Sequence, residues 1–184
     1  MLKKIIKLGG ILCLIGLITT LLLAAANYVT KPIIEENTKN NENLSRRSLV
    51  EAEEFNAIDD EETVYEGTTD GETKGYCVNV ETAGYSTGLK LIVGFDKDLA
   101  VTGIKVIESS ETPGLGANAS KPEFSDSLKG KKAPIKAKKG GNAGDDEFDA
   151  LSGATRTSEG IEKGINEAYE KVLAVAGDKE AKND

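Results

Sequence analysis

An uncharged run of 23 residues near the N-terminus constrains the fold of this chain more than any other feature. It lies between Lys7 and Lys31 and reads LGGILCLIGLITTLLLAAANYVT. As an α-helix with a rise of about 1.5 Å per residue, it would extend about 35 Å, enough to cross the hydrocarbon core of a bilayer. We therefore expect residues 1–30 to form a short cytoplasmic N-terminus and a single transmembrane helix.

The charges that flank this run indicate its orientation. Lys3, Lys4 and Lys7 precede it, whereas Glu35 and Glu36 follow soon after it. Because positively charged flanks stay on the cytoplasmic side of a membrane, we expect the N-terminus in the cytoplasm and the C-terminal domain outside it. The chain is then a single-pass protein of the cytoplasmic membrane.

A cleaved signal peptide is the alternative interpretation of the same run. Three small residues, Ala24–Ala26, have the spacing of a cleavage site. The apolar run is longer than the 7–15 residues that are usual in signal peptides. Its length favours an anchor that is retained.

Composition excludes several classes of function. The chain has no His and no Trp, so neither a His-based catalytic triad nor a His-ligated metal is available. The formal net charge is −8, and residues 1–34 contain four lysines and no acid, which leaves −12 for residues 35–184. A part of the chain this acidic is a poor binder of nucleic acid.

The two cysteines exclude further chemistry. Cys13 lies in the apolar run, so Cys77 is the single thiol of the outer part. One thiol forms no disulfide within that part, no C-x-x-C redox pair, and no cluster for zinc or iron–sulfur. We expect no metal site and interpret Cys77 as a small buried hydrophobic residue.

The outer part has the pattern of a single α+β domain. Residues 31–60 are predominantly polar with loose helical spacing, which predicts a helical linker that leaves the membrane and ends in a loop, and residues 61–177 would form the domain. Between residues 62 and 108, short β-branched or alternating runs are separated by Gly, Asp and Thr clusters. This pattern predicts a meander of antiparallel strands, and hence a mainly antiparallel sheet packed against helices.

The remainder of the domain is expected to contain shaped loops and helices. A tight loop follows the strands at ETPGLG, residues 111–116, and KPEFSDSLKG looks like a short helix. KGKKAPIKAKKGG is the one basic cluster, which we interpret as a solvated hairpin or loop. The C-terminal helix is expected to be capped by Thr157 or Ser158 and to end at Gly177, leaving residues 178–184 as a disordered tail. Its core face is formed by Ile161, Ile165, Ala168, Tyr169, Val172, Leu173 and Ala176.

Two physical interpretations of the segment LSGAT, residues 151–155, stay open. Free N–H groups at a helix start bind phosphate, whereas small hydroxylated residues before a helix also serve simply as caps. The segment lacks the Gly-Lys-Thr ending of a nucleotide-binding loop, and it is not a G-x-S-x-G elbow. A Ser/Thr hydrolase that uses Ser152 or Thr155 is disfavoured, because the chain offers neither His nor an S-x-x-K base.

A family resemblance bears on this choice. DALSGAT resembles the flavinylation signature D-x-x-[S/T]-G-A-T, in which the last threonine carries FMN through a phosphoester bond. With the N-terminal anchor and the ETPGLG loop, nearly the whole chain resembles the G subunit of the Rnf ion-translocating ferredoxin:NAD oxidoreductase complex. A related family is the C subunit of the sodium-translocating NADH:quinone reductase, which shares the FMN-binding domain.

The resemblance implies roles for particular residues. Thr155 is implied as the attachment point for FMN, and Asp149 as the residue that a flavin transferase recognises. Ser109 stands where family members often have a histidine, which puts any role of that histidine in doubt here. The implied cofactor-binding residues besides Thr155 are Ser152, Gly153 and Ala154 around the phosphate, and Glu111, Thr112, Leu115 and Gly116 beside the isoalloxazine ring, in a loop that also contains Pro113 and Gly114.

The resemblance also implies the function of the chain. It would be a membrane-anchored electron-transfer subunit rather than a stand-alone catalyst. Its partners would be the other subunits of an Rnf-type complex and, during maturation, a transferase that takes FAD as donor. The alternatives are the quinone-reductase C subunit, which is typically longer, and a secreted binding module without redox activity.

Overall fold

The computed structural model describes residues 2–182, and the side chains of all of these except 2, 5, 35 and 177–182. The chain divides into two compact units, residues 1–41 and 42–184. In the first unit the chain is helical, as part of α1 (Leu2–Leu49). Within the described residues, one helix is long and apolar enough to cross a membrane, and it includes the uncharged run. The second unit begins at Glu42, upstream of residue 61, where we expected the domain to begin.

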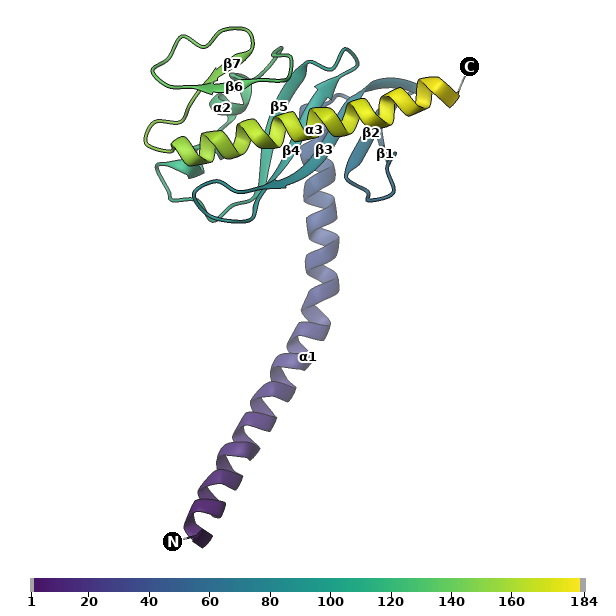
Figure 1. Ribbon diagram of the computed structural model, residues 1–184. Helices are drawn as coiled ribbons and strands as arrows, with labels where there is room; N and C mark the ends of the chain where they lie inside the picture. Colours follow the sequence, from purple (N-terminus) through teal and green to yellow (C-terminus); the bar gives the residue numbers. More distant parts are fainter. Residues whose placement is uncertain (1, 183–184) are drawn as a thin grey trace. The chain divides into compact units, whose positions relative to one another are not determined.

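A five-stranded antiparallel sheet forms the framework of the second unit (Figure 1). The strands follow each other in chain order across the sheet, so the predicted meander and the α+β class are confirmed. The β2–β3 hairpin turns at Asp70 and Gly71, which both have positive φ, as a two-residue Asp-Gly turn requires. The strands are β1 (Glu54–Ala57), β2 (Val64–Thr69), β3 (Glu72–Thr82), β4 (Leu89–Asp96) and β5 (Val101–Glu108).

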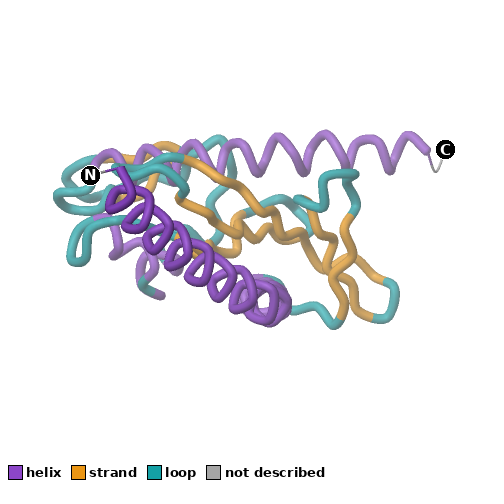
Figure 2. Tube along the Cα trace, turned by 90° about the horizontal axis from the view of Figure 1, so that it is seen from below, coloured by secondary structure: helices purple, strands orange, loops and turns teal. Residues whose placement is uncertain are grey.

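The C-terminal helix α3 (Thr155–Lys182) runs along one face of this sheet (Figures 1 and 2). Its apolar residues Ile161, Ile165, Ala168 and Val172 have no exposed surface. They pack with side chains of β3 and β4 in the main hydrophobic core. The predicted apolar face therefore holds the helix to the sheet, except at Leu173, which is 40% exposed and lies outside this core.

Both ends of α3 differ from the sequence expectation. The helix begins at Thr155 rather than at Thr157 or Ser158, which are both buried inside its first turns. The Ser158 hydroxyl donates to the Ala154 carbonyl oxygen (3.0 Å) and accepts from the Leu151 N–H (2.9 Å), so it stabilises the turn before the helix from within the helix. At the other end the helix passes Gly177 and reaches Lys182, because the segment contains no proline and residues 179–182 are good helix formers. Residues 183–184 of the expected tail lie outside the described residues.

The end of α1 belongs to the domain rather than to a linker. Leu49 and Val50 pack with Cys77 and Ile92 in a second core cluster on the other face of the sheet. Arg46 is 3% exposed, pairs with Glu42 at 2.8 Å and stacks over a tyrosine ring. The expectation of a helix and then a loop through residue 60 is wrong at residues 54–57, which pair with β2 and join the sheet as β1.

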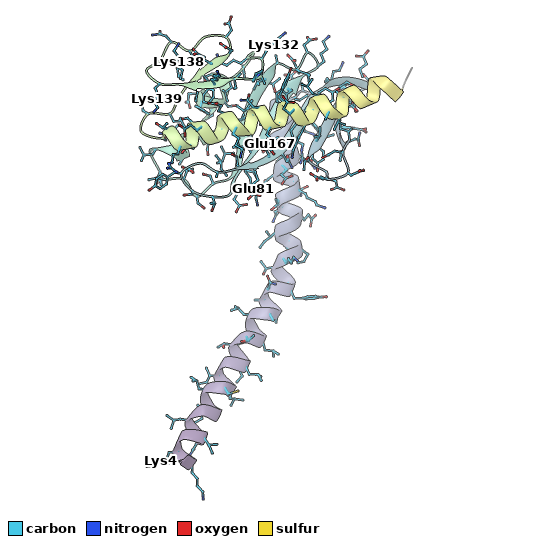
Figure 3. All side chains as sticks on the ribbon, in the orientation of Figure 1. Lys4, Glu81, Lys132, Lys138, Lys139 and Glu167 are labelled. Atoms are coloured by element: carbon cyan, nitrogen blue, oxygen red, sulfur yellow. The ribbon has the colours of Figure 1, made fainter. Side chains whose placement is uncertain are left out.

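The segment between β5 and α3 carries small elements beside the main sheet. They are a 3-10 helix (Gly116–Ser120), α2 (Pro122–Asp126), β6 (Lys136–Lys138) and β7 (Glu147–Asp149). The short helix expected in KPEFSDSLKG is confirmed as α2. Strands β6 and β7 are parallel, so the basic cluster is not a hairpin. Figure 3 shows Lys138, the last residue of β6, and the adjacent Lys139 at the periphery of the domain.

Side chains of α3 fix β6 in place. The Asn166 amide accepts from the Ile135 N–H (2.8 Å) and donates to the Ile135 carbonyl (3.0 Å). Glu162 accepts from the Ala137 N–H at 2.8 Å. Because β7 pairs with β6 and leads directly into the LSGAT segment, these bonds also fix the approach of the chain to the start of α3.

We predict that Cys77 does not react with thiol reagents in the folded protein. Burial raises the pKa of its thiol to about 12, although the Arg46 charge acts in the opposite direction. At pH 8 roughly one thiol in ten thousand is then ionised, and the side chain has no exposed surface. The measurement is maleimide labelling of a Cys13→Ser variant, followed by intact mass. Labelling should appear only after denaturation, and rapid labelling of the native protein would contradict the prediction.

Candidate functional site

A tight turn positions the start of α3. The Ala154 N–H donates to the Leu151 carbonyl (3.0 Å), and Gly153 has a φ of 72°, in the left-handed region that favours glycine. Ala154 is buried, whereas Thr155, the first residue of the helix, is partly exposed. The first N–H groups of a helix have no acceptor within it, so they remain free to bind an anion beside Thr155.

A cavity of about 460 Å³ lies at this helix start. Its size falls within the range of roughly 300–1,000 Å³ that is usual for small-molecule sites. Three separate segments of the chain line it: the loop between β3 and β4, the loop after β5, and the start of α3. The lining residues are Tyr85, Glu111, Thr112, Leu115, Gly116, Gly153, Ala154, Thr155, Arg156 and Thr157.

The carboxylate of Glu111 ties these three segments together. One carboxylate oxygen accepts a hydrogen bond from the Thr157 hydroxyl on α3 (2.7 Å), and the other accepts from the Ser86 N–H in the β3–β4 loop (3.0 Å). Glu111 itself follows β5 and is 8% exposed. Its two bonds therefore hold the neighbouring loop and the helix against the segment that begins with Glu111.

Two glycines let the backbone close around this carboxylate. A Cβ atom on Gly84 or on Gly116 would collide with the carboxylate oxygens of Glu111. A Cβ atom on Gly153 would meet the Leu115 side chain at 3.0 Å, so Leu115 lies against the turn that leads into Thr155. Gly116, the second glycine of ETPGLG, thus allows close packing against Glu111. Gly114, the first glycine, has a φ of 81°, which allows the turn that precedes Gly116.

Most of the residues that the sequence singled out meet at this cavity. Thr155, Gly153, Ala154, Glu111, Thr112, Leu115 and Gly116 all line it. Ser152 and Asp149 do not belong to the lining. Asp149 is exposed at the end of β7, where its carboxylate accepts the Ala143 N–H at 3.2 Å. Ser109 accepts the Glu111 N–H at 3.1 Å through its hydroxyl.

Sequence reasoning missed three lining residues: Tyr85, Arg156 and Thr157. The sequence predicts Thr157 as a helix cap. In the structure this residue, two positions after the signature, donates its hydroxyl to the Glu111 carboxylate. Arg156 is exposed and directly follows the signature threonine. A positive charge at this position, in a domain of net negative charge, is the sequence signal that indicates a role in the site. Tyr85 sits between Gly84 and Ser86 in a loop that the strand pattern left undescribed.

The lining fits a ligand with an anionic end and a flat apolar end. The helix start and Arg156 provide N–H groups and positive charge, and the Thr155 hydroxyl lies among them in the lining. Leu115 and Tyr85 provide apolar surface, and both are exposed, by 43% and 75% respectively. A flavin phosphate has this combination of groups.

Comparisons with known proteins identify the family of this chain. The profile of the FMN-binding domain matches residues 84–170, which contain every lining residue, and the profile of the RnfG N-terminal region matches residues 1–44. The G subunit of the proton-translocating ferredoxin:NAD(+) oxidoreductase complex of Clostridium ljungdahlii is 33% identical over 88% of each chain. The G subunit of the Na(+)-translocating complex of Acetobacterium woodii is 34% identical over 89% of each chain. The chain belongs to the family of Rnf complex G subunits.

Solved structures extend the likeness to a second family. The C subunit of the Na(+)-translocating NADH-quinone reductase of Parabacteroides distasonis is 31% identical, with a TM-score of 0.52 over 60% of each chain. NqrC of Shewanella oneidensis, at 22% identity and a TM-score of 0.54, shares the fold over 66% of this chain and 64% of that chain. This chain and the two C subunits thus share a fold over that part of their length.

Proposed function

We propose that this chain is the FMN-carrying electron-transfer subunit of an Rnf-type ferredoxin:NAD oxidoreductase complex, with FMN bound to Thr155 through a phosphoester. The observation that carries the proposal is the position of Thr155. It is the partly exposed first residue of α3, and it lines a cavity that lies within the match to the FMN-binding domain. The match of residues 1–44 to the RnfG N-terminal region, together with the 33% identity over 88% of the Clostridium ljungdahlii G subunit, favours the Rnf complex over the quinone reductase.

The residues around Thr155 suit a phosphate diester. The free N–H groups of the first turn and the Arg156 guanidinium offset its negative charge, which an acidic domain would otherwise repel. Gly153 brings no side chain that would obstruct this approach. When bound, FMN supplies reversible electron transfer, and the protein supplies its placement and its electrostatic surroundings.

Attachment requires a separate enzyme. A threonine hydroxyl is a weak nucleophile without a base, the chain has no histidine, and the nearby Glu111 carboxylate is engaged by Thr157 and Ser86. In a transferase, Thr155 Oγ would attack the FMN phosphorus of FAD. The Oγ–P bond forms, the phosphoanhydride bond breaks, AMP leaves, and the hydroxyl proton passes to a base of the transferase. The exposed Asp149 at the end of β7 is accessible for recognition by this enzyme.

A covalent cofactor is consistent with a location outside the cytoplasm. A flavin held without a bond would be lost to the medium at each dissociation, whereas a tether keeps its local concentration fixed. We propose that the apolar run of α1 spans the membrane, with the N-terminus in the cytoplasm and the flavin domain on the other side.

Cysteine labelling in intact cells tests this orientation. In the Cys13→Ser background, Asp145→Cys places a thiol on the exposed β6–β7 connection, and Lys4→Cys places one near the N-terminus. A membrane-impermeant maleimide should label the first variant in intact cells and the second only after lysis. The reverse pattern would contradict the proposed orientation.

Complementation tests the electron-transfer role. In membranes from a host strain that lacks this chain, the wild-type chain should restore ferredoxin-dependent NAD reduction. A chain with Thr155→Ala should assemble into the complex but restore no activity above the deletion background, because the cofactor is missing. Full activity of the flavin-free complex would contradict the role.

A further inference from the structure

We infer that Tyr85 contacts the isoalloxazine ring of the flavin and quenches its fluorescence. This inference rests on the proposed function, because it needs a flavin in the cavity. It concerns a residue outside both sequence motifs, in the loop between β3 and β4.

The chemistry of the lining assigns the ring to Tyr85 and Leu115. The lining residues from Gly153 to Thr157 are small, hydroxylated or cationic, and they suit the phosphate. On the other two segments, Glu111 turns its carboxylate toward Thr157 and Ser86, and Gly116 has no side chain. Tyr85 and Leu115 are the large apolar side chains that remain in the lining to cover a flat aromatic ring.

The exposure of Tyr85 leaves its ring available for contact with a ligand. Its side chain is 75% exposed, more than that of Leu115 in the same cavity. A flavin ring in contact with it would remove apolar surface from water on both partners, and aromatic rings favour offset-stacked or edge-to-face contact.

The loop that carries Tyr85 is held at both sides of this residue. The Gly84 N–H donates to the Ser86 carbonyl (3.1 Å), and the Ser86 N–H donates to Glu111 (3.0 Å). The Ser86 hydroxyl donates to the Ser110 carbonyl at 3.1 Å. Tyr85 therefore projects from a loop fixed to the same carboxylate that holds the helix start.

A tyrosine in contact with a flavin leaves a spectroscopic signature. The phenol transfers one electron to the photoexcited flavin, and the electron returns to the phenol without emission. The chain has no tryptophan, which would do the same, and Tyr85 is the one aromatic residue among those that line the cavity. Phenylalanine is much harder to oxidise than tyrosine. A Tyr85→Phe variant would therefore keep the contact with the ring and lose the quenching.

The test compares three flavin-loaded full-length variants: Tyr85→Phe, Tyr85→Leu and, as a control, Tyr169→Phe. Tyr169 lies on α3 about 21 Å from Thr155 at 1.5 Å per residue and packs on Phe95. Intact mass first establishes how much flavin each variant carries. Time-resolved flavin fluorescence at equal loading should then show a several-fold longer mean lifetime in Tyr85→Phe and Tyr85→Leu, and the wild-type lifetime in Tyr169→Phe.

The outcomes separate the two proposals. Loaded variants of Tyr85 with the wild-type lifetime would overturn the assignment of Tyr85 and leave the proposed function intact. A wild-type chain without covalent flavin, although the transferase is present, would overturn the proposed function itself. Longer lifetimes in both Tyr85 variants, with the control unchanged, support the contact with Tyr85.

Discussion

Thr155→Val is expected to abolish covalent flavin attachment completely while the domain stays folded. Valine keeps the shape of threonine and removes the hydroxyl oxygen that the phosphoester needs. Thr155 is partly exposed, and the turn before it is stabilised by Ser158 and by backbone bonds rather than by the Thr155 hydroxyl. The measurement is in-gel flavin fluorescence of protein co-expressed with the transferase, together with its thermal unfolding.

Thr112→Val is the matched control for this change. Thr112 lines the same cavity and is exposed, but it lies in the loop after β5. The control should stay yellow and fluorescent after denaturing electrophoresis. Retained fluorescence in Thr155→Val, or its loss in Thr112→Val alone, would assign the attachment to another residue.

Glu111→Ala is expected to give the largest loss of stability among the lining residues. The change leaves the Thr157 hydroxyl and the Ser86 N–H without their acceptor at a site where Glu111 is 8% exposed. An unsatisfied buried donor costs about 1–3 kcal/mol, so we expect a loss of roughly 2–5 kcal/mol in the free energy of unfolding. Thermal or denaturant unfolding of the flavin-free protein measures this loss independently of the cofactor.

Glu108→Ala provides the comparison for Glu111. Glu108 is also a glutamate near the end of β5, but it is exposed and pairs with Lys90 at the surface. An exposed ion pair of this kind contributes little, so the unfolding midpoint should stay close to that of the wild type. Equal effects of the two substitutions would contradict the role of Glu111 in joining the three segments.

The fold could be predicted where the pattern of side chains repeats. The strands of the meander alternate with turn residues such as Asp70-Gly71, and α3 repeats its apolar residues at helical spacing, so local sequence was sufficient. The end of α1 and strand β1 could not be predicted in this way. Their structure depends on contacts with Cys77, Ile92 and Tyr65, which are distant in sequence.

The site could be predicted in part for a similar reason. The two motifs mark the loop after β5 and the start of α3, but the sequence does not reveal that Glu111 bonds to Thr157, 46 residues away. Thr157 therefore looked like a helix cap. Tyr85 belongs to neither motif, and only the closure of the β3–β4 loop onto Glu111 brings it to the cavity.

The central claim is that Thr155 carries the flavin, and peptide mapping of the chain from its native membrane tests it most directly. Proteolysis and tandem mass spectrometry of a peptide that contains residues 149–158 locate any added group. The account predicts one FMN phosphoryl group on Thr155, and none on Ser152 or Thr157. An unmodified Thr155 in a preparation from cells that contain an active flavin transferase would contradict it.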